Sequence, residues 1–156
     1  MTAASAIRSY VVLPGEGQQM SALGLTAIEK IRSADTDGVS YAFEVISPAG
    51  FGIPPHVHTH EDEVLYVIEG EFEIFLAGET LHAGPGSVLN FTRGTAHGFQ
   101  GIASPISRAL HVVTPGSSFE QFMHELVSLP PGPPDMQQIA ALFGKYGMEI
   151  LPPPGQ

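Results

Sequence analysis

Short runs of alternating apolar and polar residues fill the middle of the chain, with Gly or Pro between them. In residues 38–48, for example, Tyr41, Phe43 and Val45 occupy every second position, which is the period of a β-strand. The same pattern predicts further strands at 63–69, 71–77, 79–83, 87–91, 96–100 and 106–114, and weaker ones near 8–13 and 26–32. So many short antiparallel strands predict an all-β fold that closes into a barrel or jelly roll and hides its strand edges.

The spacing of apolar residues changes after Pro115. Residues 118–128 are expected to form a helix, because Ser118 and Gln121 resemble a capping box and the apolar residues fall on one helical face. This predicted face consists of Phe119, Phe122, Met123, Leu126 and Val127. The helix is expected to pack against the barrel.

A Pro-rich run at 129–134 cannot continue a helix and predicts an extended connector. A second helix is expected over about 134–146, with Pro134 and Asp135 at its start. Its predicted apolar stripe consists of Met136, Ile139, Ala140 and Phe143. The final residues, 151–156, are expected to form a loose tail or an arm on a neighbouring surface.

Composition and charge narrow the class of protein. A chain of 156 residues with 43% hydrophobic content is expected to form one domain over residues 1–156. Sixteen acidic and six basic residues give a formal charge of −10, which disfavours nucleic acid and anionic membranes as partners. The sequence shows no signal-peptide pattern and no run long enough to span a bilayer, so a soluble cytoplasmic protein is expected.

Three histidines and a glutamate have the spacing of metal ligands: His56, His58, Glu63 and His97. Because side chains alternate along a strand, His56 and His58 project to the same face and can bind one ion. With no cysteine in the chain, the ligands must be nitrogen and oxygen atoms. Three imidazoles and one carboxylate suit a first-row transition metal and leave one or two coordination positions free, as in a catalytic site.

Glycines at fixed distances from these residues extend the pattern. The first block, G-x5-H-x-H-x4-E-x6-G, comprises Gly50, His56, His58, Glu63 and Gly70. The second block comprises Gly86, Gly94 and His97. Together they resemble the two motifs of the cupin family, although Thr92 and Gly101 replace the usual Pro and Asn of the second motif. The resemblance implies a double-stranded β-helix over about 38–115 with a metal inside, followed by a C-terminal extension, 116–156.

The whole chain is similar to the small cupins grouped with quercetin 2,3-dioxygenase. This similarity implies an oxygenase in which His56, His58, Glu63 and His97 bind one divalent metal ion per chain. It also implies that Glu63 is the catalytic base toward a flavonol-type or other enolic substrate, with O2 as the second substrate. Small cupins commonly pair, so a homodimer is expected. The metal stays open among Mn, Fe, Co, Ni and Zn.

Two alternatives to a dioxygenase remain open at this point. A non-redox enzyme could use the ion only to polarise a carbonyl for isomerisation, cyclisation or decarboxylation. A non-enzymatic protein could bind a metal or a small molecule without turnover. Oxygen dependence separates the first alternative from a dioxygenase, and the absence of any product separates the second.

The remaining candidates concern the surroundings of the metal. Strand alternation places Leu65, Val67 and Phe99 on the face of Glu63 and His97, which predicts an apolar substrate pocket. His111 is interpreted as either a hydrogen-bonded core residue or a pocket residue. His60 could replace His58 as a ligand, but the glycine and glutamate spacing favours His58. The residues expected at the surface are His82, His124, Glu61 and Asp62.

Overall fold

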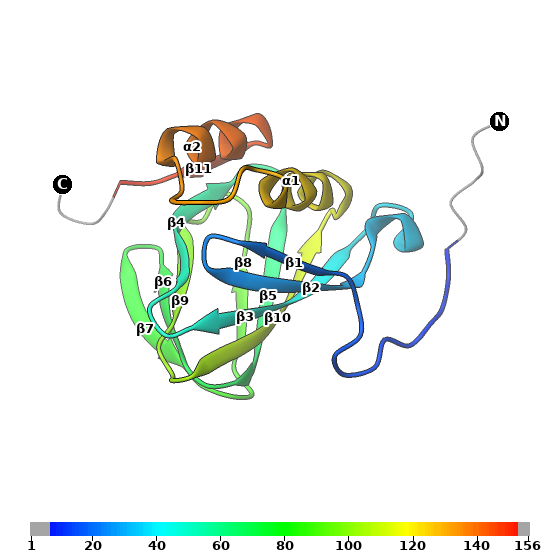
Figure 1. Ribbon diagram of the computed structural model, residues 1–156, viewed down its shortest axis with the longest axis horizontal. Coiled ribbons are helices and arrows are strands. Elements are labelled where there is room, and N and C mark those ends of the chain that lie inside the picture. Colours follow the sequence, from blue (N-terminus) through cyan, green and yellow to red (C-terminus); the bar gives the residue numbers. More distant parts are fainter. Residues whose placement is uncertain (1–6, 153–156) are drawn as a thin grey trace.

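The computed structural model describes residues 7–152 as two facing β-sheets with two helices at one end (Figure 1). The larger sheet contains, in spatial order, β1 (Gln19–Ala22), β2 (Leu25–Ile31), β3 (Tyr41–Pro48), β10 (Ile106–Thr114), β5 (Asp62–Glu69) and β8 (Val88–Phe91). The smaller sheet contains β11 (Met148–Ile150), β4 (Gly52–His58), β9 (His97–Gly101), β6 (Phe72–Leu76) and β7 (Glu79–Ala83). The fold is the jelly roll expected from the sequence, but its two sheets keep open edges instead of closing into one ring.

Strand β10 lies in the middle of the larger sheet and carries the inward side chains on which the site depends. It pairs antiparallel with β3 on one side and β5 on the other. Ala109, His111 and Val113 are buried, whereas the intervening residues are partly exposed. This period of two is the pattern of a strand with one face in the core.

The core between the sheets is aromatic and aliphatic. Its fully buried members include Tyr41, Leu65, Val67, Phe72, Ile74 and Phe91. Helix α1 (Ser117–Val127) adds the four predicted residues Phe119, Phe122, Met123 and Leu126, with Val127 partly buried against them. Neither helix in the described residues is long and apolar enough to cross a membrane.

The predicted capping box of α1 is wrong. The N-cap is Gly116, and no side chain caps it. A Cβ at Gly116 would lie 2.4 Å from the carbonyl carbon of Ser40, so close contact with the chain before β3 selects glycine there. The helix therefore starts at Ser117, one residue earlier than predicted.

Helix α2 (Met136–Lys145) begins at Asp135 as predicted, because the Asp135 carboxylate accepts hydrogen bonds from the backbone N–H groups of Gln137 and Gln138. Its buried face differs from the predicted stripe. The buried residues are Ile139, Leu142 and Phe143, whereas Met136 and Ala140 are exposed. Apolar residues occur all around this helix, so their spacing alone did not define one face.

One predicted strand is absent, and two observed strands were not predicted. Residues 8–13 form no strand, and Val11 and Leu13 are exposed. Strands β1 and β11 were not predicted, because they are short, with four and three residues. Strand β11 pairs with the His56–His58 segment of β4. A loose tail or an arm was predicted for residues 151–156. The Leu151 N–H group donates a hydrogen bond to the Pro55 carbonyl, and residues 153–156 lie outside the described residues.

Candidate metal centre

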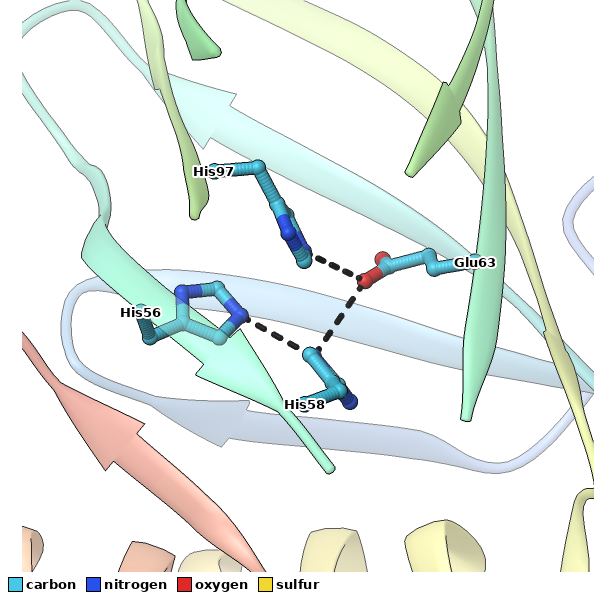
Figure 2. A group of neighbouring side chains, drawn as sticks. All are labelled: His56, His58, Glu63 and His97. Atoms are coloured by element: carbon cyan, nitrogen blue, oxygen red, sulfur yellow. Dashed lines mark hydrogen bonds and ion pairs between the residues drawn. The ribbon is translucent and has the colours of Figure 1, made fainter. Parts of the chain in front are cut away.

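Three strands bring His56, His58, Glu63 and His97 together between the sheets (Figure 2). Strand β4 presents both of its histidines to the same side, β5 supplies Glu63, and His97 is the first residue of β9. His56 and His97 are also direct partners across β4 and β9. One ligand atom from each residue lies within 4.8 Å of the other three, and all four side chains are buried.

The atoms that face one another are the Nε2 atoms of the histidines and one carboxylate oxygen. His56 Nε2 lies 3.0 Å from His58 Nε2. The Glu63 Oε2 atom lies 3.3 Å from His97 Nε2 and 3.6 Å from His58 Nε2. These distances leave the donor atoms around one common point.

The Nδ1 atoms face away from this point, and each has an acceptor of its own. His56 Nδ1 donates to the Pro54 carbonyl at 2.8 Å, and His97 Nδ1 to the Thr95 carbonyl at 3.0 Å. The acceptor of His58 Nδ1 is the Glu61 carboxylate at 3.3 Å. A neutral histidine that donates from Nδ1 carries a lone pair on Nε2, and such outer partners are typical of metal-binding histidines.

Three nitrogen lone pairs and a carboxylate oxygen therefore converge in a buried space. Without a cation between them, these atoms would repel one another at the observed distances. A divalent transition metal relieves that repulsion, and imidazole and carboxylate are suitable ligands for it. The four residues could thus hold a metal ion.

Burial and neighbouring groups keep His56 and Glu63 in the protonation states that bind metal. Burial lowers the pKa of His56 to about 3, and nearby His97 and His58 act in the same direction. Burial alone would raise the pKa of Glu63, but the hydrogen bond from His111 and the nearby rings of His97 and His58 hold that pKa well below its usual value. Neutral imidazole and ionised carboxylate are the forms that bind a divalent ion.

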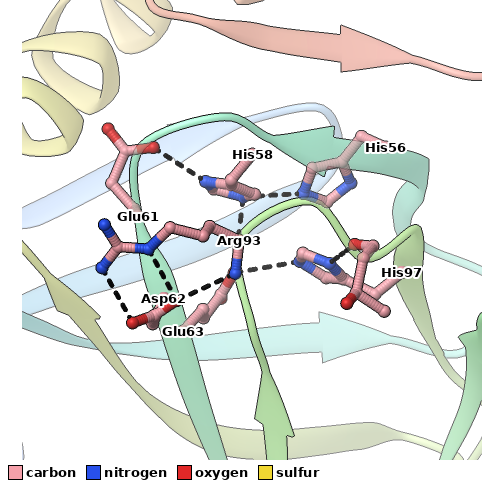
Figure 3. Close-up of polar contacts among 8 residues, drawn as sticks. His56, His58, Glu61, Asp62, Glu63, Arg93 and His97 are labelled. Carbon is pink, nitrogen blue, oxygen red and sulfur yellow. Dashed lines mark hydrogen bonds and ion pairs between the residues drawn. The ribbon is translucent and has the colours of Figure 1, made fainter.

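Glu61 is buried beside the candidate metal centre, whereas the sequence predicted a solvated turn for it. Its side chain is 2% exposed and accepts the hydrogen bond of His58. Asp62 points to the other side, where Arg93 donates to it from the backbone and the guanidinium (Figure 3). Asp62 therefore pairs with Arg93, while the preceding residue, Glu61, lies against His58. No pattern in the sequence indicated that Glu61 is buried.

Replacement of Glu61 by glutamine is expected to weaken zinc binding about tenfold. The variant keeps the size of the side chain but removes the negative charge that makes His58 a stronger ligand. Competition with a fluorescent zinc chelator measures the affinity. The exposed Glu79→Gln is the matched control, and an equal affinity in both variants would contradict a role for Glu61 in metal binding.

An apolar cavity lies next to the ligands, lined by side chains from both sheets and both helices. The volume of this cavity is about 70 Å³. Among its described lining residues, the polar side chains are His56, Glu63 and His111. Phe99 also lines this cavity, whereas Leu65 and Val67 lie in the packed core.

The other histidines have separate environments. His60 and His82 are exposed, and the His82 ring lies beside the carboxylates of Glu71 and Glu73. His124 is exposed as predicted, and its Nε2 atom lies 2.5 Å from an oxygen of the buried Glu29. His111 fulfils both interpretations, since it is hydrogen-bonded in the core and lines the cavity.

Comparison with known proteins places this architecture in a family. Residues 42–113 match the model of the cupin domain. This part of the chain is a cupin domain. The chain is 29% identical to quercetin 2,3-dioxygenase of Bacillus subtilis over 119 residues, which cover 75% of this chain and 34% of that enzyme. This cupin therefore spans about a third of the length of that relative.

Solved structures of other proteins have a similar fold. The structure of KdgF from Halomonas sp. superposes with a TM-score of 0.62 and 23% identity, covering 69% of this chain and 94% of that one. The polyketide cyclase RemF from Streptomyces resistomycificus has a TM-score of 0.60 and 26% identity, covering 69% of this chain and 80% of that one. The first of these likenesses shows the fold alone.

Proposed function

We propose that this cupin is a metal-dependent dioxygenase that acts on a small phenolic or enolisable molecule. The observation that carries the proposal is the shared wall of the metal centre and the cavity. Two of the four ligands, His56 and Glu63, line the apolar cavity. A molecule in this cavity would therefore lie against the ion, as a substrate of a metal enzyme must.

The cavity suits a flat apolar body with one polar group. Aromatic side chains supply much of its wall, including Phe43, Phe99, Phe119 and Phe122. Within this wall, Glu63 and the hydrogen-bonded His111 are placed to take up the proton of a substrate hydroxyl. A bound Mn, Fe, Co, Ni or Zn ion would act as a Lewis acid that favours the deprotonated hydroxyl.

The similarity to a quercetin 2,3-dioxygenase supports oxygen as the co-substrate. In a dioxygenase reaction both atoms of O2 enter the product, so O2 is the oxidant and no external reductant is needed. The chain covers only 34% of that relative. The dioxygenase reaction and the substrate class are therefore proposals for this chain.

Metal-loaded protein is expected to consume O2 in the presence of a flavonol, an acireductone or a β-diketone, in proportion to substrate consumed. An oxygen electrode measures uptake for protein loaded separately with Mn, Fe, Co and Ni, and mass spectrometry with ¹⁸O2 checks that both oxygen atoms enter the product. Protein stripped with a chelator serves as the control. Background uptake with every metal and every substrate class would sink the dioxygenase proposal.

A second candidate is a non-redox metal enzyme that catalyses cyclisation, isomerisation or decarboxylation. The likeness to the polyketide cyclase RemF favours this alternative, because it covers more than two thirds of each chain at 26% identity. Such an enzyme would turn over without oxygen and would work with zinc. Full anaerobic activity of the zinc-loaded protein on a polyketide-like substrate would replace the first proposal with this one.

A further inference from the structure

The two nitrogen atoms of His111 have different surroundings. Nδ1 lies 2.5 Å from Glu63 Oε1. Nε2 is buried and has no hydrogen-bond partner among the described residues. The side chain as a whole is only 1% exposed. A buried polar atom without a partner is unfavourable, and a bound group that supplies the missing hydrogen bond is one reason for a protein to keep such an atom.

Neighbouring strands and rings fix the position of His111 on the cavity wall. Strand β10 holds it opposite Phe43 of β3 and Leu65 of β5. Its ring stacks on Phe43 with centroids 5.1 Å apart and planes inclined by 14°, and Phe99 packs on it at the same centroid distance. The hydrogen bond to Glu63 sets the rotation of the ring. The ring that carries the unpartnered Nε2 atom is thus held in one place, and His111 is among the residues that line the cavity.

The carboxylate of Glu63 decides which nitrogen of His111 carries the proton. Its Oε2 atom faces the ligand nitrogens of His58 and His97, and its Oε1 atom faces His111. A carboxylate only accepts hydrogen bonds, so Nδ1 must be the donor in this pair. The neutral ring then has a lone pair on Nε2 and can accept one further hydrogen bond.

We propose that His111 Nε2 accepts a hydrogen bond from a hydroxyl group of the molecule bound in the cavity. His111 is then a specificity-determining residue, and the site selects a phenol or enol over the corresponding ether. Glu63 acts behind it by orienting the ring, as a carboxylate orients histidine in other enzymes. This inference rests on the proposed use of the cavity but not on a reaction with O2.

Binding of 3-hydroxyflavone and of its methyl ether, 3-methoxyflavone, tests the inference. The full chain is loaded with zinc and titrated without oxygen, and the flavone fluorescence gives both Kd values. Wild-type protein is expected to prefer the hydroxyl compound. His111→Asn keeps an amide N–H near the position of Nδ1 but has no atom at the position of Nε2. The variant is expected to lose about tenfold of the preference, expressed as the ratio of the two Kd values.

Two further variants separate recognition from general damage. His111→Gln places an amide near the position of Nε2 and is expected to retain the preference within about threefold. Phe122→Leu removes apolar contact from another part of the wall, so both Kd values should rise while their ratio stays constant. Zinc content is measured for every variant and is expected to stay at the wild-type level.

Several results would overturn the role of His111. An unchanged ratio in zinc-loaded His111→Asn would show that Nε2 is not the acceptor. Equal binding of the two compounds to wild type, or binding of neither, would exclude selection of the hydroxyl. Loss of zinc in His111→Asn would make His111 a support for Glu63 alone. A weaker preference for the hydroxyl compound in His111→Asn, together with background O2 uptake by wild-type protein, would support this inference and exclude only the dioxygenase proposal.

Discussion

Replacement of His97 by alanine is expected to abolish stoichiometric metal binding and to lower the affinity for zinc more than about a hundredfold. Loss of an outer partner of a metal ligand already costs about 10- to 100-fold, and His97 supplies a donor atom itself. The substitution also removes the group that lies 3.3 Å from Glu63 Oε2. Metal analysis of protein purified without chelator, followed by competitive zinc titration, measures both effects.

Two controls make this result specific to the metal centre. His82→Ala removes an exposed histidine and should leave the zinc content at the wild-type level. Circular dichroism of His97→Ala should retain the β-sheet spectrum, because the core residues that hold the sheets are apolar. Retention of one zinc ion per chain by a folded His97→Ala variant would show that His97 is not a ligand.

The grouping of the four candidate ligands could be predicted from strand alternation and from the glycine spacings of the cupin motifs. Alternation along one strand places His56 and His58 on the same face. The glycine spacings then relate them to Glu63 and to His97 without any knowledge of the packing. A motif of this kind indicates which residues meet, and the structure brings those four within 4.8 Å of one another.

The surroundings of the ligands depend on contacts between distant segments and could not be predicted in the same way. Glu61 is buried against His58, which lies on a different strand from Glu63, whereas an acidic triplet alone is typical of a solvated turn. Residues Phe119, Phe122 and Phe143 of the helices line the cavity, although the sequence indicated only that the first helix packs on the barrel. The pocket was therefore assigned to strand residues, of which Leu65 and Val67 lie in the core.

The pairing of β4 with β9 depends both on local sequence and on contact between distant segments. Pro54 and Pro55 have no N–H to donate, and the register shifts between Ile53 and His56 before His56 pairs with His97. Two glycines let the strands approach across this irregular stretch. A Cβ at Gly98 would lie 2.9 Å from the Ile53 carbonyl oxygen, and one at Gly52 only 1.9 Å from the Phe99 carbonyl oxygen.

Gly52→Ala is therefore expected to lower the free energy of unfolding by about 3 kcal/mol or more, because the new methyl group overlaps the backbone of β9 and separates the strands that carry three of the ligands. Urea denaturation of the metal-free protein measures the loss, and zinc titration should show weaker binding. The control is Gly84→Ala, whose Cβ meets no atom within 4 Å and which should change stability by less than about 0.5 kcal/mol. Equal stability of the two variants would mean that β4 and β9 can move apart freely, and the close approach of these strands would then not be what fixes the geometry of the metal centre.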